Sequence, residues 1–431
     1  MADVIVKKTE CLRGALRAPP SKSLTHRAFI AASLSDGLST IEDPLICEDT
    51  LATIEACKML GARIANDHEN RFLVIGRAKP DTPENVINCR ESASTIRFLT
   101  PVCALADGIS ILTGGPSLRK RPMKPILDAL SRLGVPCYSA RGDGYPPLIV
   151  FGGGIRGGAT SLPGDISSQF VSGLLFATPL AKGQTQIIIS SPLESKPYVS
   201  MTLDILKKHG VKVDADGKYE KFEIHAPQTY IPFNHKIEGD YSSAAFLFVA
   251  AAITGSDLKV ENLRKDSLQG DRVIVDILQE IGVQIEVGDD HVRILGAEKR
   301  LKPLDINAED HPDLVPPLVV LSSFIRGKSR IRGVTRLRYK ESNRIVSLMD
   351  ELSKMGVKMS LVDDSFVIFG DEKIRGAEVN SHGDHRIAMA CIVAGLRAEG
   401  ATIVHGAECI NKSYPNFLRD LSSVGGEIIE R

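Results

Sequence analysis

Basic residues stand beside hydroxyl residues where the sequence predicts the start of a helix. In the stretch 19–27, PPSKSLTHR, two prolines end the preceding segment, Ser21 can cap a helix, and a mostly apolar run follows. A helix N-terminus carries partial positive charge and unpaired N–H groups. Lys22, Ser23 and Arg27 on its first turns would therefore suit an anionic ligand, although an ordinary capped helix explains this stretch equally well when it is taken alone.

Further stretches share this character. The segment 91–97, ESASTIR, opens a helix with small and hydroxyl residues, and residues 114–124 carry four cations between Arg119 and Lys124. No aromatic residue is interleaved there to stack on bases, so a local anion-binding loop is better supported than a nucleic-acid patch. A solvated loop stays an alternative. The segments 164–168 and 239–243 are copies of one G-D-x-S-S helix start, and Ser167, Ser168 and Gln169 could bind a phosphorylated ligand. Ser195-Lys196-Pro197-Tyr198 is expected in a turn, where it could add hydroxyl contacts.

Two carboxylates lie among basic residues in the second half of the chain. Asp313 is expected at a helix N-terminus, where an acid is a favourable cap but could also act as a general base. The run 336–344, RLRYKESNR, is expected on a helix, which would place Lys340 and Arg344 one turn apart on one face. A surface ladder of salt bridges is the alternative for this run.

The last apolar helix should open with His385 and Arg386, and Lys412 follows near the C-terminus. His382 and His385 lack an evident third partner, so no metal site is expected. Each motif has an ordinary structural explanation, but together they supply more cations than one carboxylate needs. A compact ligand bearing both phosphate and carboxylate would fit that charge, held by the forked guanidinium groups of arginine.

The elements that must position these residues follow a repeat. A helix-ending glycine followed by a short β-branched run recurs at intervals of 69–76 residues, at Gly61, Gly134, Gly210, Gly282, Gly356 and Gly425. A second helix recurs on the same period, starting near Ser21, Ser94, Ser168, Ser242, Pro312 and His385. Six copies of an α/β unit account for the chain. Because one unit is too small to close its own core, we expect two groups of three, with the second helices converging on a shared centre and the site lying between the groups.

Composition narrows the class of protein. The 431 residues are 43% hydrophobic and 25% charged with a formal net charge of zero, so no global field recruits nucleic acid or a membrane. The eight cysteines lack metal-ligand spacing, the N-terminus does not resemble a signal peptide, and the longest apolar run, 244–253, is too short to span a bilayer. A cytoplasmic protein is expected.

A G-x-G-x-x-G match at 152–157 is not followed by a helix start and is interpreted as a turn between strands.

As a set, these motifs resemble the 5-enolpyruvylshikimate-3-phosphate (EPSP) synthase family of enolpyruvyl transferases. The matching segments run in order through the whole chain: PSKSLTHR at 20–27, RP at 121–122, SSQF at 167–170, SKPY at 195–198, PD at 312–313, KESNR at 340–344, DHR at 384–386 and Lys412. The resemblance implies an α/β fold, an inside-out α/β barrel of two domains, with three repeated βαβαββ units in each and the active site in the interdomain cleft. It implies one domain over 21–236 and another over 1–20 plus 237–431.

The resemblance also implies the substrates and their residues. Shikimate 3-phosphate would be bound by Ser23, Arg27, Ser167, Ser168, Gln169, Ser195, Tyr198, Asp313, Arg336 and Lys340. Phosphoenolpyruvate would be bound by Lys22, Ala93, Arg121, Gln169, Arg344, Arg386 and Lys412. The catalytic residues would be Lys22, Asp313, Glu341 and His385. Addition followed by elimination would need no cofactor and no metal, in a protein expected to be monomeric, with no nucleic-acid or membrane partner and with glyphosate as an inhibitor.

Three positions depart from the pattern of the family. Ala93 replaces a common Gly, and its methyl group should disfavour glyphosate more than phosphoenolpyruvate. Glu91 replaces the usual Asn and puts a negative charge near an anion site, and Asn343 replaces the usual Asp, a change expected to be tolerated.

Two other functions compete with this one. The sister enzyme, which transfers enolpyruvyl to UDP-N-acetylglucosamine, has a Cys or Asp five residues before its R-P, where this chain has Pro116. A catalytically silent or RNA-end-processing relative is disfavoured by the presence of Lys22, Asp313 and Glu341 together and by the zero net charge.

Overall fold

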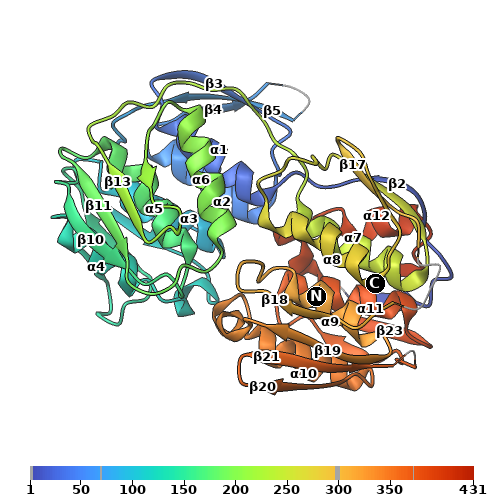
Figure 1. Cartoon of the computed structure of the whole chain (residues 1–431). Coiled ribbons are helices and arrows are strands. Elements are labelled where there is room, and N and C mark those ends of the chain that lie inside the picture. Colours follow the sequence, from blue (N-terminus) through green and yellow to red (C-terminus); the bar gives the residue numbers. More distant parts are fainter. Residues whose placement is uncertain (1–2, 68–69, 297–300, 372) are drawn as a thin grey trace. The chain divides into compact units, whose positions relative to one another are not determined.

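Six four-stranded sheets and the helices packed on them make up the described part of the chain (Figure 1). The computed structural model describes residues 3–67, 70–296, 301–371 and 373–431. The chain divides into two compact units, one comprising Ser21–Ile237 and the other Met1–Pro20 together with Glu238–Arg431. Each unit has its own cluster of buried apolar side chains.

The unit Ser21–Ile237 contains three of the sheets. In sheet order, their strands are β14 (His235–Lys236), β3 (Gly37–Glu42), β5 (Arg71–Gly76) and β4 (Arg63–Asn66); β6 (Ile87–Asn88), β7 (Ile109–Thr113), β9 (Leu148–Phe151) and β8 (Cys137–Ser139); and β10 (Gly158–Leu162), β11 (Thr185–Ile189), β13 (Lys221–Ile224) and β12 (Asp214–Ala215). Its helices are α1 (Lys22–Ser33), α2 (Glu48–Met59), α3 (Ala93–Cys103), α4 (Lys124–Arg132), α5 (Ser168–Ala177) and α6 (Lys196–Lys208).

The other unit contains the remaining three sheets. In sheet order, their strands are β16 (Ile285–Val287), β17 (His291–Ile294), β15 (Asp257–Glu261) and β2 (Arg13–Arg17); β18 (Asp305–Asn307), β19 (Gly327–Arg332), β21 (Ser365–Gly370) and β20 (Lys358–Val362); and β22 (Glu378–Asn380), β23 (Ala401–His405), β1 (Val4–Lys7) and β24 (Ile428–Glu430). Its helices are α7 (Tyr241–Thr254), α8 (Ile274–Ile281), α9 (Val315–Ser323), α10 (Arg344–Lys354), α11 (His385–Arg397) and α12 (Phe417–Ser423).

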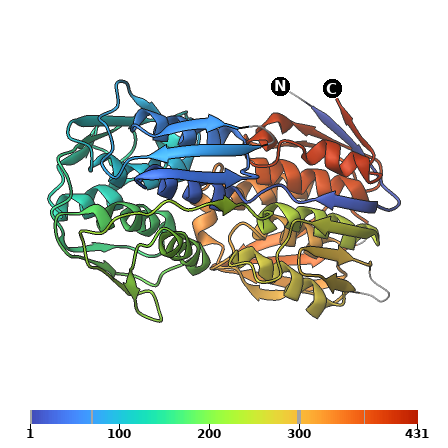
Figure 2. The same ribbon diagram turned by 90° about the horizontal axis from the view of Figure 1, so that it is seen from above.

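All six sheets share one pairing pattern. One edge strand is parallel to its neighbour, and the next two pairings are antiparallel, as in β10–β11–β13–β12. The N-terminal strand β1 completes the C-terminal sheet, where it lies antiparallel between β23 and β24 (Figure 2). The first and last segments of the chain are therefore held in one sheet.

The most apolar helices lie inside the units. α7 is buried along all fourteen residues, and α7, α9 and α11 pack on one another. In the other unit α3 packs against α5, and both are buried along nearly their whole length. A helix that is apolar on every side is stable only when protein surrounds it. None of the described helices is both long and apolar enough to cross a membrane.

The six helix-ending glycines predicted from the sequence all have positive φ, between 75° and 104°. The helix expected near Pro312 begins three residues later, at Val315. In that helix two prolines occupy its first turn, where their missing N–H groups are not needed. The glycine-rich segment 152–157 connects β9 to β10, as predicted.

Candidate active site

The predicted site residues fall into two sets, one in each compact unit. The unit Ser21–Ile237 carries Lys22, Ser23, Arg27, Ala93, Arg121, Ser167, Ser168, Gln169, Ser195 and Tyr198. The other unit carries Asp313, Arg336, Lys340, Glu341, Arg344, His385, Arg386 and Lys412. Within each set the structure brings most members together at the starts of buried helices.

Asp313 is surrounded by cations. Its side chain lies just before α9, where Oδ1 is 3.0 Å from the NH1 atom of Arg344 and Oδ2 is 3.0 Å from the NH2 atom of Arg386. The ammonium group of Lys340 is 3.5 Å from Oδ1. Lys340 and Arg344 come from one run at the start of α10, and Arg386 comes from the first turn of α11, so two separate stretches of sequence meet at the Asp313 carboxylate.

This arrangement fixes the charges. Burial by itself would raise the pKa of Asp313, but the positive charges of Arg386, Lys340 and Arg344 outweigh it and hold the pKa well below its ordinary value. Burial lowers the pKa of Lys340 to about 8, against the opposing effect of Asp313. The carboxylates around Arg344 overcome its burial and raise its pKa. Asp313 is therefore an anion, and Arg344 a cation, throughout the neutral range.

Asp384 holds Arg344 from the other side, and sequence reasoning did not assign it to the site. Its fully buried carboxylate accepts from Nε and NH2 of Arg344 at 2.8 and 3.2 Å and from the hydroxyl of Ser342 at 3.1 Å. It also caps α11 by accepting from the backbone N–H of Arg386. An acid before a helix is usually just a cap, so the sequence signal for this second role is weak.

Glu341 and Lys412 extend the cluster. Glu341 Oε2 accepts from NH2 of Arg344 at 2.7 Å, and its Oε1 lies 3.6 Å from Nζ of Lys412, which ends the 3-10 segment Ala407–Lys412. His385 is buried as the first residue of α11, and Arg336 is buried in the 3-10 segment Thr335–Tyr339.

The expectation that Lys340 and Arg344 share a helix was wrong, because α10 begins only at Arg344. The two residues meet through Asp313 rather than through a common helix face. Asn343 is the N-cap of α10, with its Oδ1 accepting from the N–H of Val346 at 3.5 Å. Asn and Asp are comparable caps.

In the unit Ser21–Ile237, Lys22 begins α1 and forms a 3.0 Å ion pair with Asp49 on the first turn of α2. The Asp49 side chain is only 6% exposed. Sequence reasoning missed this residue, because an acid in the first turn of a helix is the usual complement to the helix dipole.

Arg27 is buried and bound to its own unit. Its guanidinium donates from Nε to the hydroxyl of Thr202 and from NH1 and NH2 to the carbonyls of Ser23 and Tyr198, all at 2.8 Å. The ring of Phe98 lies 5.0 Å below the guanidinium carbon. Arg27 therefore ties α1 to α6, the helix that follows Ser195.

Arg97 connects α3 to the G-D-x-S-S loop and was also missed. Its NH1 donates to Ser167 Oγ at 3.2 Å and to Gln169 Oε1 at 2.9 Å. Gln169 in turn donates to Ser94 Oγ at 2.8 Å, and Ser168 is the first residue of α5. Arg97 lies one turn after Ala93 on α3 and therefore on the same face. This spacing was the sequence signal that could have placed Arg97 near the predicted site.

Ser195 is not part of an ordinary turn, which corrects the expectation for the segment 195–198. It caps α6, which begins at Lys196, and takes a left-handed conformation with φ of 57°. Its hydroxyl is buried and has no hydrogen-bond partner among the described residues. A strained residue with an unsatisfied buried hydroxyl is a common feature of a binding site.

Glu91 turns toward the neighbouring loop. Its carboxylate accepts from the backbone N–H groups of Ser117 and Leu118, at 3.4 and 2.8 Å. These contacts anchor the loop that leads to Arg121, which is buried after the 3-10 segment Leu118–Lys120. Ala93 is the first residue of α3 and is 7% exposed.

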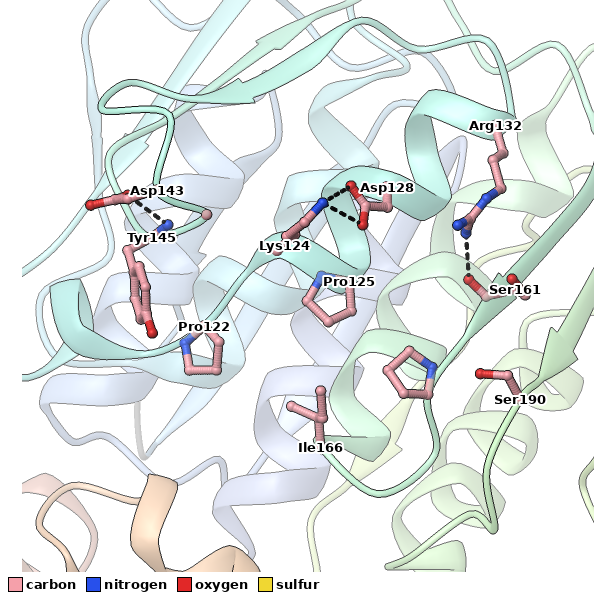
Figure 3. A pocket seen from close by; sticks show the side chains of 12 residues that line it. Pro122, Lys124, Pro125, Asp128, Arg132, Asp143, Tyr145, Ser161, Ile166 and Ser190 are labelled. Atoms are coloured by element: carbon pink, nitrogen blue, oxygen red, sulfur yellow. Dashed lines mark hydrogen bonds and ion pairs between the residues drawn. The ribbon is translucent and has the colours of Figure 1, made fainter.

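A pocket of about 440 Å³ lies beside this set of residues (Figure 3). Pro122, which follows Arg121, and Ile166, which precedes Ser167, both line it. At its rim Lys124 is paired with Asp128, and Arg132 donates to the carbonyl of Ser161. Both cations are therefore engaged by neighbouring groups. The pocket borders two predicted binding loops, but none of the predicted site residues lines it.

The two sets define a class of protein. Clustered cations beside buried carboxylates can bind a ligand carrying several negative charges and can move protons to and from it. The described residues contain no cluster of three His, Cys, Asp or Glu side chains able to hold a metal ion. Groups of this kind in an α/β protein are typical of enzymes that act on small anionic substrates.

Comparison with known proteins specifies that class. The family model of EPSP synthase (3-phosphoshikimate 1-carboxyvinyltransferase) matches residues 6–421. The chain is 44% identical over 426 residues to a 3-phosphoshikimate 1-carboxyvinyltransferase of Methanocaldococcus jannaschii, and 43% identical over 424 residues to one of Methanothermobacter thermautotrophicus, covering 98–99% of each. A solved EPSP synthase structure from Acinetobacter baumannii aligns with a TM-score of 0.84 at 27% identity, covering 100% of this chain and 99% of that one. The chain belongs to the EPSP synthase family.

Proposed function

We propose that the chain carries out the reaction of its family with the residues described above. The enolpyruvyl group of phosphoenolpyruvate is transferred to the 5-hydroxyl of shikimate 3-phosphate, which yields 5-enolpyruvylshikimate 3-phosphate and phosphate in aromatic amino acid biosynthesis. The observation that carries the assignment of roles is the Asp313 carboxylate held by Arg344, Arg386 and Lys340. Because three cations surround a single carboxylate, positive charge is left over to bind an anionic substrate.

Phosphoenolpyruvate would be bound by Lys22, Ala93, Arg121, Gln169, Arg344, Arg386 and Lys412. Shikimate 3-phosphate would be bound by Ser23, Arg27, Ser167, Ser168, Gln169, Ser195, Tyr198, Asp313, Arg336 and Lys340. The buried hydroxyl of Ser195 and the network of Arg97, Ser167 and Gln169 support a phosphate site in the unit Ser21–Ile237. Arg27 would act mainly by holding Ser23 and Tyr198 in place, because its guanidinium already donates to both of their carbonyls.

Asp313 would accept the proton of the 5-hydroxyl while the oxygen attacks C2 of phosphoenolpyruvate. Glu341 would donate a proton to the methylene carbon, giving a tetrahedral ketal phosphate. Loss of a proton from that carbon and of phosphate then restores the double bond, with Lys22 stabilising the charge of the departing phosphate. His385, buried beside Asp384, completes the proposed catalytic set.

Substrate binding would also adjust the base. With its pKa held low by three cations, Asp313 is a weak proton acceptor. An incoming carboxylate or phosphate would take over part of the bonding of Arg344 and Arg386, since both guanidinium groups prefer anionic oxygens. Asp313 would thereby regain basicity when both substrates are present, which would couple proton removal to complete loading of the site.

The finer architecture is part of this proposal. Two domains, over 21–236 and over 1–20 plus 237–431, would each form an inside-out α/β barrel of three repeated βαβαββ units, with the active site between the domains. The shared pairing pattern of the six sheets supports the repeat. The protein would act as a cytoplasmic monomer without cofactor or metal, with glyphosate as an inhibitor to which Ala93 reduces sensitivity.

Phosphate release from phosphoenolpyruvate tests the function. The assay is run with shikimate 3-phosphate, with UDP-N-acetylglucosamine and with neither. We expect release only with shikimate 3-phosphate. Release that requires the nucleotide sugar would assign the sister reaction, although Pro116 stands where that enzyme carries its Cys or Asp. Absence of release from folded protein with either acceptor would contradict transferase activity.

A further inference from the structure

Glu351 is a buried carboxylate outside the proposed binding and catalytic sets. It lies on α10, with its side chain 2% exposed, and accepts three hydrogen bonds. The donors are Nζ of Lys354 at 2.6 Å, the backbone N–H of Asn380 at 2.8 Å and Nε2 of His382 at 2.7 Å. Two of the three donors belong to residues 380–384, which run from the last residue of β22 to the N-cap of α11, so Glu351 ties α10 to that segment.

The tied segment, residues 380–384, has an unusual backbone. His382 and Gly383 are both left-handed, with φ of 53° and 66°. This conformation is costly for a residue with a side chain and persists only where the surroundings hold it. The N–H of His382 donates to Asn380 Oδ1 at 2.7 Å, and Ser381 Oγ donates to the carbonyl of Gly406 at 2.8 Å. The imidazole bond to Glu351 adds a side-chain restraint at the strained residue itself.

The same helix holds the far end of this segment through the proposed site. Arg344 precedes Glu351 by seven residues on α10, which is two turns and therefore the same face. Its guanidinium donates to Asp384, the cap of α11, while Asp384 also accepts from the backbone N–H of Arg386. The path of residues 380–383 thus sets the position of Asp384. Asp384 in turn orients Arg344 and Arg386, whose guanidinium groups both pair with Asp313.

We propose that Glu351, acting through His382 and Asn380, is a positioning residue for the Arg344–Asp384–Arg386 group. This inference rests on the proposed function, in which Arg344 and Arg386 bind phosphoenolpyruvate. Burial of a carboxylate is costly unless it is paired and hydrogen-bonded, and an apolar side chain at this point of α10 would avoid that cost. What the carboxylate provides in return is the fixed geometry of a loop. The three donors offset the effect of burial and hold the pKa of Glu351 below its ordinary value.

Steady-state kinetics on the full chain test the proposal, with each substrate varied separately. The variants are Glu351→Leu, Glu351→Gln and His382→Gly, the last because glycine accepts the left-handed backbone while the side chain that bonds Glu351 is removed. Asp350→Leu is the matched control, an acid on the same helix that is exposed. We expect Glu351→Leu and His382→Gly to raise KM for phosphoenolpyruvate about 10- to 100-fold, and KM for shikimate 3-phosphate to stay near that of the parent. Glu351→Gln can still accept the hydrogen bond from the N–H of Asn380, so its KM for phosphoenolpyruvate should stay close to that of the parent.

The double variant Glu351→Leu/His382→Gly should be no worse than the poorer single variant, since both changes break one tie. If Glu351→Leu does not fold, His382→Gly and Glu351→Gln carry the test. Unchanged KM for phosphoenolpyruvate in the folded variants would overturn the proposal. A rise in KM of equal size for both substrates would overturn it as well, because it would indicate general loosening. An inactive parent protein would instead count against the proposed function.

Discussion

Arg386 binds Asp313 at two points, donating from NH1 to its backbone carbonyl at 3.1 Å and from NH2 to its Oδ2 at 3.0 Å. The first bond fixes the main chain before α9, and the second orients the carboxylate. Because Arg386 is the second residue of α11, next to the Asp384 cap, two helix starts distant in sequence are held together at the proposed base. The proposed proton acceptor and part of the proposed phosphoenolpyruvate site are therefore held by the same contacts.

Replacing Asp313 by Asn should remove the base while keeping the shape of the site. We expect kcat to fall about 10²- to 10⁴-fold, with binding of shikimate 3-phosphate retained. Stopped-time phosphate assays and equilibrium binding measure the two effects. Asp305→Asn, which removes an exposed partner of Arg332, is the control and should leave kcat unchanged. A kcat of Asp313→Asn within a few-fold of the parent would assign proton removal to another group.

Arg27→Lys should weaken the unit Ser21–Ile237. The forked guanidinium makes three hydrogen bonds at 2.8 Å in a buried position, and a lysine ammonium cannot match that geometry. We expect the free energy of unfolding to fall by about 2–4 kcal/mol and KM for shikimate 3-phosphate to rise. Denaturant unfolding is compared with that of Arg132→Lys, an exposed arginine that donates to one carbonyl. Equal stability of the two variants would refute a structural role for the Arg27 fork.

Ala93→Gly should increase inhibition by glyphosate. The hypothesis follows from the methyl group of Ala93 at the first position of α3. Removing it would open space for the bulkier inhibitor and change KM for phosphoenolpyruvate less. Inhibition curves at fixed phosphoenolpyruvate measure the effect. An unchanged inhibition constant in Ala93→Gly would dismiss the hypothesis.

Acid should destabilise the unit Ser21–Ile237 through a buried imidazole pair. His209 and His235 face each other with their Nε2 atoms 2.9 Å apart. Burial lowers the pKa of His209 to about 4 and that of His235 to about 3. In the unfolded chain both would titrate near 6.5. Between pH 6.5 and 4 the unfolded state therefore binds more protons, and stability is lost as the pH falls through this window.

Each such imidazole should lower the free energy of unfolding by about 1.4 kcal/mol per pH unit below its unfolded pKa. Urea unfolding between pH 7 and 4 measures the slope. His235→Leu should reduce the slope of unfolding free energy against pH by the contribution of one imidazole. His225→Gln, at an exposed position, should leave the slope as in the parent. A slope unaltered in His235→Leu would mean that this pair does not sense pH.

The sequence alone predicted what local chemistry can specify. The helix starts at Lys22, Ser168 and His385 and the glycine helix ends depend on caps and backbone conformation, which act within a few residues. The basic character of the predicted site residues was also visible, because Lys22, Arg344 and Arg386 each stand in a short segment that carries further cations or a histidine. Where a motif had an ordinary structural use, as in Asp49 and Asp384, the sequence offered no way to separate a cap from a partner of the site.

Tertiary structure decided which charges meet. Lys340 and Arg344 were expected to share a helix face, yet they converge on Asp313 from either side of a helix start. Arg97 donates to Ser167, seventy residues further along the chain. Glu351 bonds to His382, whose left-handed backbone no local sequence pattern predicted. Such contacts depend on how buried helices pack, because packing places side chains from distant segments within hydrogen-bond reach. The sequence therefore determined the kinds of groups available, and the packing of the helices determined their partners.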